Sequence, residues 1–333
     1  FNLPDGKHYA WFEVARAFAS KNYYPLCLHV NAKNAGAAQN RPRFIMIAMR
    51  EDTFNSLIEN EKNGEFKEAM NQVKEFCSKK KPQPFIDLHF HDISKNPIFF
   101  KHSILRSLNQ YRSDTHWHSV KDAIDDLSGC EEAENSSKYL KLIKRRFPEE
   151  KYNNVEHATS RNDEPRKNNA LVQRRFRVYQ ILADAKKNHG LPIIEKEVIK
   201  YLRDPTSFQL SQEVIEYLSS QLFLPERDAS YTTANEVEFV SLNSRGEIEI
   251  YLKKLATKKQ TQRALIASSP APAALSIPDD ACHYKNRLFR TLTVREMARF
   301  QSFPDWFEFR SKVTTGGQMR RFEVPQYTQV GNA

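Results

Sequence analysis

A continuous apolar run, Phe44–Met49, constrains the fold more than any other segment of the chain. Such a run is typical of a strand that is buried on both faces, as in a sheet covered by helices. Before it, Leu26–Val30 is predicted to form a short strand, and residues 8–20 carry apolar side chains at helical spacing. We therefore expect residues 8–50 to fold as helix, strand, loop and strand.

The long middle of the chain, residues 51–285, has a different pattern. It is charged, rich in lysine and mainly helical, with polar loops that contain proline. Residues 262–278 are rich in Ala, Ser and Pro, which favours extended chain over helix. The predicted helices are 51–78, 119–127, 137–147, 169–188, 194–203 and 211–221.

The last segment, residues 286–333, returns to a compact pattern. Thr293-Val-Arg-Glu296 has the spacing of a capping box, in which the Thr hydroxyl accepts from the third helical amide and the Glu reaches back. A helix is therefore predicted over 294–301. A short ordered segment is expected at Tyr327–Val330.

Composition limits the classes of function. The 333 residues contain 51 Lys and Arg against 41 Asp and Glu, a net charge of +10, which favours a polyanionic partner such as nucleic acid. None of the nine glycines lies in a Gly-x-Gly, so the chain lacks the usual dinucleotide-binding loop. No run approaches the roughly 18 apolar residues of a membrane span, which argues against an integral membrane protein.

The four cysteines are Cys27, Cys77, Cys130 and Cys282, and no two form a Cys-x-x-Cys pair. Their wide spacing supports neither a disulfide framework nor a zinc site. It suits a reducing compartment, so a cytoplasmic location is predicted.

Three segments carry a family resemblance. They are residues 31–47 near the start of the chain, which contain Gln39-Asn-Arg41-Pro-Arg43, then Arg290–Asp305, and Gln326-Tyr-Thr-Gln-Val-Gly-Asn-Ala333. In this order they resemble the C-terminal signature blocks of DNA (cytosine-5) methyltransferases: the Gln-x-Arg-x-Arg block, the block that supports the target recognition domain, and the Gly-Asn-Ala block. The resemblance is close over residues 8–50 and 286–333.

The resemblance implies a fold and an activity. The fold would be α/β, an incomplete Rossmann-like class I methyltransferase fold with a large, mainly helical recognition insertion. Residues 1–50 would give the last strands of the catalytic domain, 51–285 the DNA-binding target recognition region, and 286–333 the return to the catalytic domain. The intact enzyme would transfer methyl from S-adenosylmethionine to carbon 5 of a cytosine flipped out of a specific duplex site, most often in a restriction–modification system.

Residue roles carry over from the same blocks. Arg43 would contact the flipped cytosine, Arg41 would contact the DNA backbone or order the site, and Gln39 would support them. Arg41 and Arg43 are expected on one face of a strand, where the alternative is an ordinary ion pair at the strand edge. Arg295 and Glu296 would support the recognition domain, and Asn332 and Ala333 would lie near the cofactor.

Three parts of the family pattern are missing. No cysteine follows a proline, so the Pro-Cys nucleophile is absent, and so are the Glu-Asn-Val block and the Gly-rich cofactor loop. The chain is therefore expected to be the C-terminal half of a methyltransferase, inactive alone, whose N-terminal half is a separate subunit or part of the same gene. The alternative is a non-enzymatic DNA-recognition subunit of a split methyltransferase.

Two further groups of residues, one of histidines and one of basic residues, each have two interpretations. His89, His91, His102, His116 and His118 could ligate a metal from two strands, but coincidence or proximity to phosphate is the preferred interpretation, and no metal is predicted. Basic residues also recur at helical spacing. A solvated helix face is one interpretation of them, and contact with DNA phosphate is the other. The DNA-binding candidates are Arg145, Arg146, Arg174 and Arg175.

Overall fold

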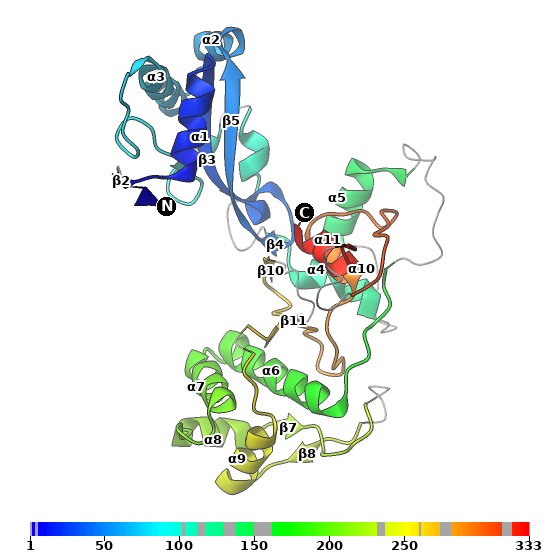
Figure 1. Ribbon diagram of the computed structural model, residues 1–333. Helices are drawn as coiled ribbons and strands as arrows, with labels where there is room; N and C mark the ends of the chain where they lie inside the picture. Colours follow the sequence, from blue (N-terminus) through cyan, green and yellow to red (C-terminus); the bar gives the residue numbers. More distant parts are fainter. Residues whose placement is uncertain are drawn as a thin grey trace. The chain divides into compact units, whose positions relative to one another are not determined.

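The computed structural model describes residues 2–3, 6–101, 104–111, 117–128, 137–149, 162–231, 237–259, 261–273, 281–314 and 322–332. The chain divides into two compact units, residues 1–117 and residues 118–333 (Figure 1). We describe each unit by itself.

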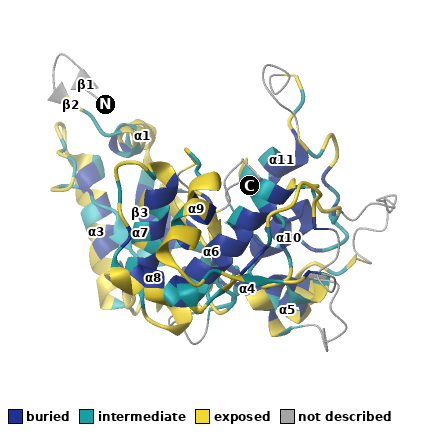
Figure 2. Cartoon of the chain, turned by 90° about the horizontal axis from the view of Figure 1, so that it is seen from below, coloured by how far each residue is buried: buried dark blue, intermediate teal, exposed yellow. Residues whose placement is uncertain are grey.

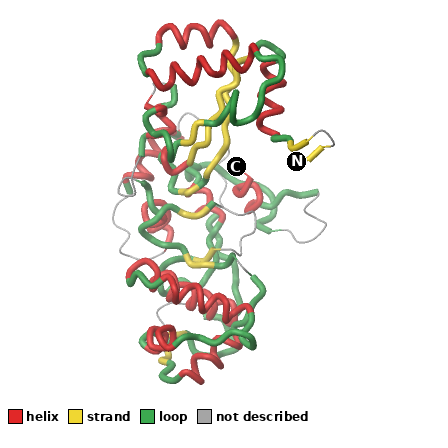
Figure 3. Tube along the Cα trace, turned by 90° about the vertical axis from the view of Figure 1, so that its left-hand side faces the viewer, coloured by secondary structure: helices red, strands yellow, loops and turns green. Residues whose placement is uncertain are grey.

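Unit 1 is built on a three-stranded sheet in the order β5-β3-β6. Its strands are among those drawn in yellow in Figure 3. Strand β3 (Tyr23–Asn31) pairs antiparallel with β5 (Pro42–Arg50) along its whole length, and β6 (His91–Asp92) is parallel to β3 on the other side. Helix α1 (Ala10–Ala19) precedes β3. The predicted order of helix, strand, loop and strand over residues 8–50 is confirmed.

The core of unit 1 joins this sheet to the helices that follow it. Helix α2 (Glu51–Asn60) contacts β5, and α3 (Gly64–Ser78) contacts β3, so the predicted helix 51–78 is two helices. Phe66, Met70 and Phe76 of α3 are buried in one cluster with Phe12 of α1 and the apolar side of β3. Residue 50 is therefore not a boundary between compact units, because the chain as far as residue 117 folds with the sheet.

The strand that is buried on both faces is β3, not β5. Four successive residues of β3, Pro25–Leu28, are buried, whereas Phe44 in β5 is 41% exposed and Ile45–Ala48 are half-buried. The prediction for Phe44–Met49 was wrong because β5 has one strand partner, β3, and lies at an edge of this sheet in the described chain. An apolar run gives the strand but does not say whether it is central.

Unit 2 is mainly helical. Helix α6 (Ala170–Asn188) packs against α7 (Pro192–Arg203), with α8 and α9 in the same core, and α10 contacts α4 and α11. Figure 2 shows α10 buried along its length. The other helices are α4 (Val120–Ile124), α5 (Lys138–Arg146), α8 (Gln212–Ser219), α9 (Arg245–Lys254), α10 (Val294–Phe300) and α11 (Gln326–Asn332).

Most helix predictions in unit 2 are confirmed to within two or three residues, but two differ. Helix α9 was not predicted, although Ser244 and Glu247 form a capping box at its start. The segment Tyr327–Val330 is part of helix α11. The short strands are β1 (Asn2–Leu3), β2 (Gly6–Lys7), β4 (Gln39–Asn40), β7 (Leu222–Phe223), β8 (Val240–Ser241), β9 (Arg263–Ala264), β10 (Ala271–Pro272) and β11 (Ala281–Cys282).

The fold is mixed α/β, as predicted. An incomplete Rossmann-like sheet is not confirmed, because the largest sheet of the described residues has three strands and one of its two pairings is antiparallel. Among the described residues, no helix combines the length and the apolar character needed to cross a membrane.

Candidate functional site

The segment that carries Gln39, Arg41 and Arg43 begins at Asn31, the last residue of β3, and runs through a loop into β5. The Asn31 side-chain oxygen accepts from the backbone amides of Lys33, at 3.3 Å, and Arg41, at 3.0 Å. Its amide nitrogen donates to the Asn40 side chain at 2.7 Å. The Ala32 amide donates to the Arg41 carbonyl at 3.0 Å. One asparagine therefore ties both ends of the loop together.

Residues near the C-terminal end of unit 1 pack against the turn of this loop. Gly36 has a φ of 99°, and a Cβ there would lie 2.7 Å from the Tyr111 ring, so only glycine fits. The Trp117 indole donates to the Asn34 side-chain oxygen and to the Tyr111 carbonyl, both at 3.0 Å. The Lys33 ammonium lies 3.4 Å from the centre of the Trp117 ring. These contacts fix the loop backbone beside the two arginines.

The three predicted side chains have different surroundings. Gln39 is buried, at 1% exposure, and Arg41 is 7% exposed. Arg43 is exposed, and its Nη1 donates to the Pro42 carbonyl at 3.0 Å. Arg41 lies between β4 and β5, so the prediction that both arginines belong to one strand was wrong. Burial, and then the charge of Arg43, lower the pKa of Arg41. Arg43 is the arginine of this pair that is open to a ligand.

None of the three described cysteines is poised as a nucleophile. Burial raises the pKa of Cys27 to about 12 and that of Cys77 to about 11. Cys282 is 1% exposed, and burial raises its pKa as well. A thiol with a raised pKa holds almost no thiolate at neutral pH. Cys130 lies outside the described residues.

Helix α10 is the centre of a buried polar network in unit 2. The predicted capping box is confirmed: the Thr293 hydroxyl accepts from the Glu296 amide at 3.1 Å, and the Glu296 carboxylate accepts from the Thr293 amide at 2.8 Å. Arg290 donates to both Glu296 oxygens, at 2.8 and 2.7 Å. Burial alone would lower the pKa of Arg290, but Glu296 raises it. His283 lies 3.6 Å from the same carboxylate, and both side chains are fully buried.

Two further arginines of α10 hold neighbouring segments. Arg295, at 2% exposure, donates to the carbonyls of Pro304 and Phe307. Arg299 donates to both Asp305 oxygens at 2.8 Å and to the Ala123 carbonyl of α4 at 3.2 Å. Arg295 and Glu296 thus have structural roles inside unit 2. That they support a recognition domain stays a prediction.

Helix α5 presents an exposed basic face. Its apolar residues Tyr139, Leu140 and Ile143 are buried. The Tyr139 hydroxyl donates to the Arg299 carbonyl at 2.5 Å, and the Trp306 indole donates to the Phe147 carbonyl at 2.9 Å, so both ends of the helix are fixed. We call its exposed cations the α5 basic face: Lys138, Lys141, Lys144, Arg145 and Arg146.

The arginines of α6 have internal partners instead. Arg174 is 7% exposed and lies 3.7 Å from Glu226. Arg175 donates to the carbonyls of Leu255, at 2.8 Å, and Ala256, at 3.1 Å, at the end of α9. These internal contacts argue against contact of Arg174 and Arg175 with DNA phosphate, which stays an untested prediction.

The predicted cofactor residues form no pocket by themselves. Asn332 is exposed at the end of α11, whose Val330 is buried, and Ala333 lies outside the described residues. One exposed side chain at the end of a helix does not form a binding site for S-adenosylmethionine, so the role of Asn332 and Ala333 stays a prediction.

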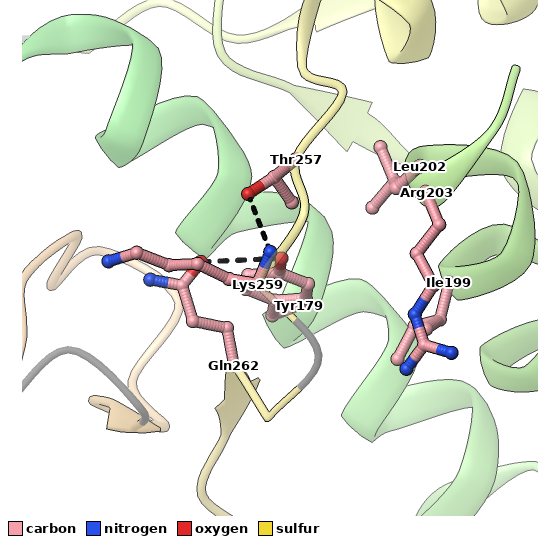
Figure 4. Close-up of a pocket in the computed structure, with 7 residues that line it drawn as sticks. All are labelled: Tyr179, Ile199, Leu202, Arg203, Thr257, Lys259 and Gln262. Atoms are coloured by element: carbon pink, nitrogen blue, oxygen red, sulfur yellow. Dashed lines mark hydrogen bonds between the residues drawn. The ribbon is translucent and has the colours of Figure 1, made fainter. Parts of the chain in front are cut away.

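The described parts of the chain include an open cavity of about 110 Å³, lined by residues of α6, the segment 265–268, Tyr284 and Asn286, but no metal centre is found in them. No group of three or more His, Cys, Asp or Glu side chains is placed to hold a metal ion there. His89 and His91 have ring centres 4.8 Å apart, and burial, then His89, lower the pKa of His91 to about 4. His102 and His116 lie outside the described residues. Figure 4 shows a small depression lined in part by Tyr179, Arg203 and Lys259, with no room for a water molecule.

Comparison with known families gives one result. A family model described as C-5 cytosine-specific DNA methylase matches residues 4–333, essentially the whole chain. No curated protein and no solved structure matches. The match extends over the long middle segment, and it does not itself support the expectation of a C-terminal fragment.

Proposed function

Because the chain belongs to the C-5 cytosine-specific DNA methylase family, we propose that it takes part in methylation of cytosine at carbon 5 in a specific duplex DNA site. Members of this family use S-adenosylmethionine as methyl donor. We further propose that the chain supplies base contacts and DNA recognition, whereas the nucleophile and the cofactor loop come from another segment or subunit.

The observation that carries this proposal is the exposed Arg43 at the end of a fixed loop. A guanidinium group suits the cytosine carbonyl oxygen, because it donates in a plane and keeps its charge in a dry site. Arg43 has this role. Arg41 is buried and lies close enough to Arg43 for the two charges to interact. Its role is to order the loop beside Arg43. Gln39, also buried, supports the turn into β5.

The proposed division of labour rests on the cysteines. The reaction of the family needs a thiolate to attack carbon 6 of cytosine, and burial raises the pKa of Cys27, Cys77 and Cys282. A Pro-Cys segment must therefore be supplied to the Arg43 site, by an N-terminal half encoded in the same gene or by a separate subunit. The same observation favours the second candidate, a DNA-recognition subunit without catalytic residues of its own.

DNA recognition is assigned to unit 2. The α5 basic face contains five cations on a fixed helix, which suits contact with phosphate. Since residues 51–78 fold with the sheet of unit 1, we restrict the proposed recognition region to residues 118–285. A restriction–modification role and a cytoplasmic location remain part of the proposal.

Labelled S-adenosylmethionine tests the catalytic part. The 333-residue chain alone should transfer no methyl group to DNA. When it is combined with a Pro-Cys segment from a family member, transfer should appear, and Arg43→Ala should lower turnover about 100- to 1000-fold. Arg50→Ala, at the other end of β5, is the control and should leave turnover unchanged, because Arg50 is exposed and its side chain pairs with the exposed Asp52. Normal turnover in Arg43→Ala would show that Arg43 is only a strand-edge cation.

A chimaera tests the recognition part. Residues 118–289 are replaced by the corresponding segment of a family member in the reconstituted enzyme, and the methylated site is mapped by bisulfite sequencing. The exchange runs to residue 289 because Phe289 packs in one small core with Tyr231 of the recognition region. The site should change to that of the donor. An active chimaera that keeps the original site would place recognition elsewhere.

A further inference from the structure

A row of three aromatic rings lies in unit 2, apart from the α5 basic face in sequence. The Phe289 ring centre is 6.3 Å from that of Tyr231 and 6.2 Å from that of Phe239, and both pairs meet edge to face. Tyr231 and Phe289 are 6% and 5% exposed and share a small core with Leu224 and Val237. The row is therefore a rigid support, held by packing.

An exposed arginine lies against each end of this row. The Arg227 guanidinium carbon is 3.8 Å from the centre of the Tyr231 ring, and that of Arg287 is 5.9 Å from the centre of the Phe239 ring. Both residues are exposed and both lie in loops. Arg227 also donates to the Ser230 carbonyl at 2.9 Å. The ring contacts limit the orientations of two side chains that would otherwise be mobile.

A third, buried arginine fixes the loop that carries Arg287. Arg177 of α6 is 8% exposed and lies 5.4 Å from the Phe239 ring centre. It donates to the Leu222 carbonyl at 2.8 Å and to the side chain of Asn286, the neighbour of Arg287, at 3.3 Å. Arg177 therefore connects β7, Phe239 and the Arg287 loop.

Acidic residues also lie near this row. Glu226, next to Arg227, accepts two hydrogen bonds from Lys254, each of 2.9 Å, and also faces Arg174. Asp228 and Glu238 are exposed beside the two ends of the row. Three arginines thus lie against two of its three rings, in a unit that also bears the α5 basic face.

We propose that Arg227 and Arg287 contact base edges of duplex DNA and contribute to sequence choice, an inference that rests on the proposed DNA-binding function of unit 2. An arginine whose plane is already oriented can donate two parallel hydrogen bonds to guanine O6 and N7 in the major groove. The α5 basic face, with three lysines and two arginines on one helix, supplies phosphate contacts that carry no sequence information.

The test is selection of the full chain against duplexes with a randomised central segment. The wild type should enrich a motif that contains guanine. Arg227→Lys and Arg287→Lys keep the charge but lose the planar fork, so each should reduce the preference for a guanine position about 5- to 150-fold. Phe239→Leu, which removes a ring of the row, should weaken the same preference as Arg287→Lys. Arg263→Lys is the control and should keep the motif, because Arg263 is an exposed arginine in β9 with no ring contact among the described residues.

The outcomes separate the two proposals. If the wild type binds no duplex, both the DNA-binding function and this inference are overturned. If the wild type enriches a motif and both lysine variants enrich the same one with equal strength, only this inference is overturned. A uniform loss of affinity for all sequences would make the two arginines phosphate contacts and would also contradict base recognition.

Discussion

Helix α5 and helix α6 both contain clustered arginines, yet their side chains have opposite surroundings. In α5, Arg145 and Arg146 are exposed in the last turn. In α6, Arg174 and Arg177 are buried, and Arg175 donates to two carbonyls of the chain. Clustered arginines alone therefore do not show whether a helix offers an exposed basic surface, as α5 does, or packs its arginines inside a core, as α6 does.

The apolar residues around the charges explain the difference. Helix α5 buries only three residues, Tyr139, Leu140 and Ile143, which form one stripe. Helix α6 buries side chains all round, including the consecutive run Phe176–Leu182. A helix that is buried on every side lies in the centre of a core, so its arginines need internal acceptors. Charge clusters are informative only when the apolar stripe beside them is narrow.

The buried side of this comparison is tested most strongly at Glu296. Glu296→Gln removes the carboxylate that binds Arg290 through two hydrogen bonds and leaves a buried cation without its counter-charge. The free energy of unfolding should fall by about 3–5 kcal/mol, measured by urea denaturation. Glu249→Gln, which breaks a partly exposed pair with Arg245, should change it by no more than about 1 kcal/mol. Equal losses of stability in Glu296→Gln and Glu249→Gln would mean that the α10 network adds no more stability than a surface ion pair.

The two helices can be compared by making the same type of substitution, Arg to Met, in each of them. Arg175→Met in α6 removes two hydrogen bonds from a charged donor to the end of α9. It should lower the free energy of unfolding by about 1.5–3 kcal/mol. Arg145→Met in α5 should change it by less than about 0.5 kcal/mol, because that side chain is exposed. Thermal unfolding of both variants measures the difference, and the reverse order would contradict the assignment of α6 to the core.

A buried histidine in each unit makes the free energy of unfolding depend on pH, which the arginines do not, because they stay charged over this range. Burial lowers the pKa of His91 in unit 1 to about 4, and lowers that of His283 in unit 2 well below its ordinary value. The unfolded chain then takes up protons first as the pH falls below about 6.5, so stability is present above that pH and is lost towards pH 4. The loss is at most about 1.4 kcal/mol per pH unit for each histidine.

Chemical denaturation between pH 7 and pH 5 measures this slope. His91→Gln should make the slope shallower, because it removes a buried imidazole whose pKa is lowered. A stability that rises as the pH falls over this interval would contradict the neutral, buried state of both histidines.

Much of the local structure could be predicted from the sequence. Apolar spacing located α1, β3 and most helices of unit 2, and the capping box at Thr293 and Glu296 gave the start of α10. These signals are local, because they depend on residues within one or two turns. Helix α9 had such a signal at Ser244 and Glu247 and could have been found.

Long-range features could not be predicted in this way. The exposed edge position of β5 depends on which strands pair, and the single-unit packing of residues 1–117 depends on α3 reaching β3. The loop around Arg41 is fixed by Trp117 and Tyr111, which lie at least 70 residues further along the chain. The motif block located Gln39, Arg41 and Arg43, but only the structure distinguishes the buried Arg41 from the exposed Arg43.

The salt dependence of DNA binding tests the central claim most directly. The full chain and two variants, Lys144→Gln/Arg145→Gln/Arg146→Gln in α5 and Arg175→Gln in α6, are titrated with one labelled duplex at several salt concentrations. If the α5 cations contact phosphate, the triple variant should lower the slope of log K against log salt by about 2.7. Arg175→Gln should leave that slope unchanged, at a temperature where it is folded. An unchanged slope in the α5 variant, or a reduced one in the α6 variant, would contradict the assignment of DNA binding to the α5 basic face.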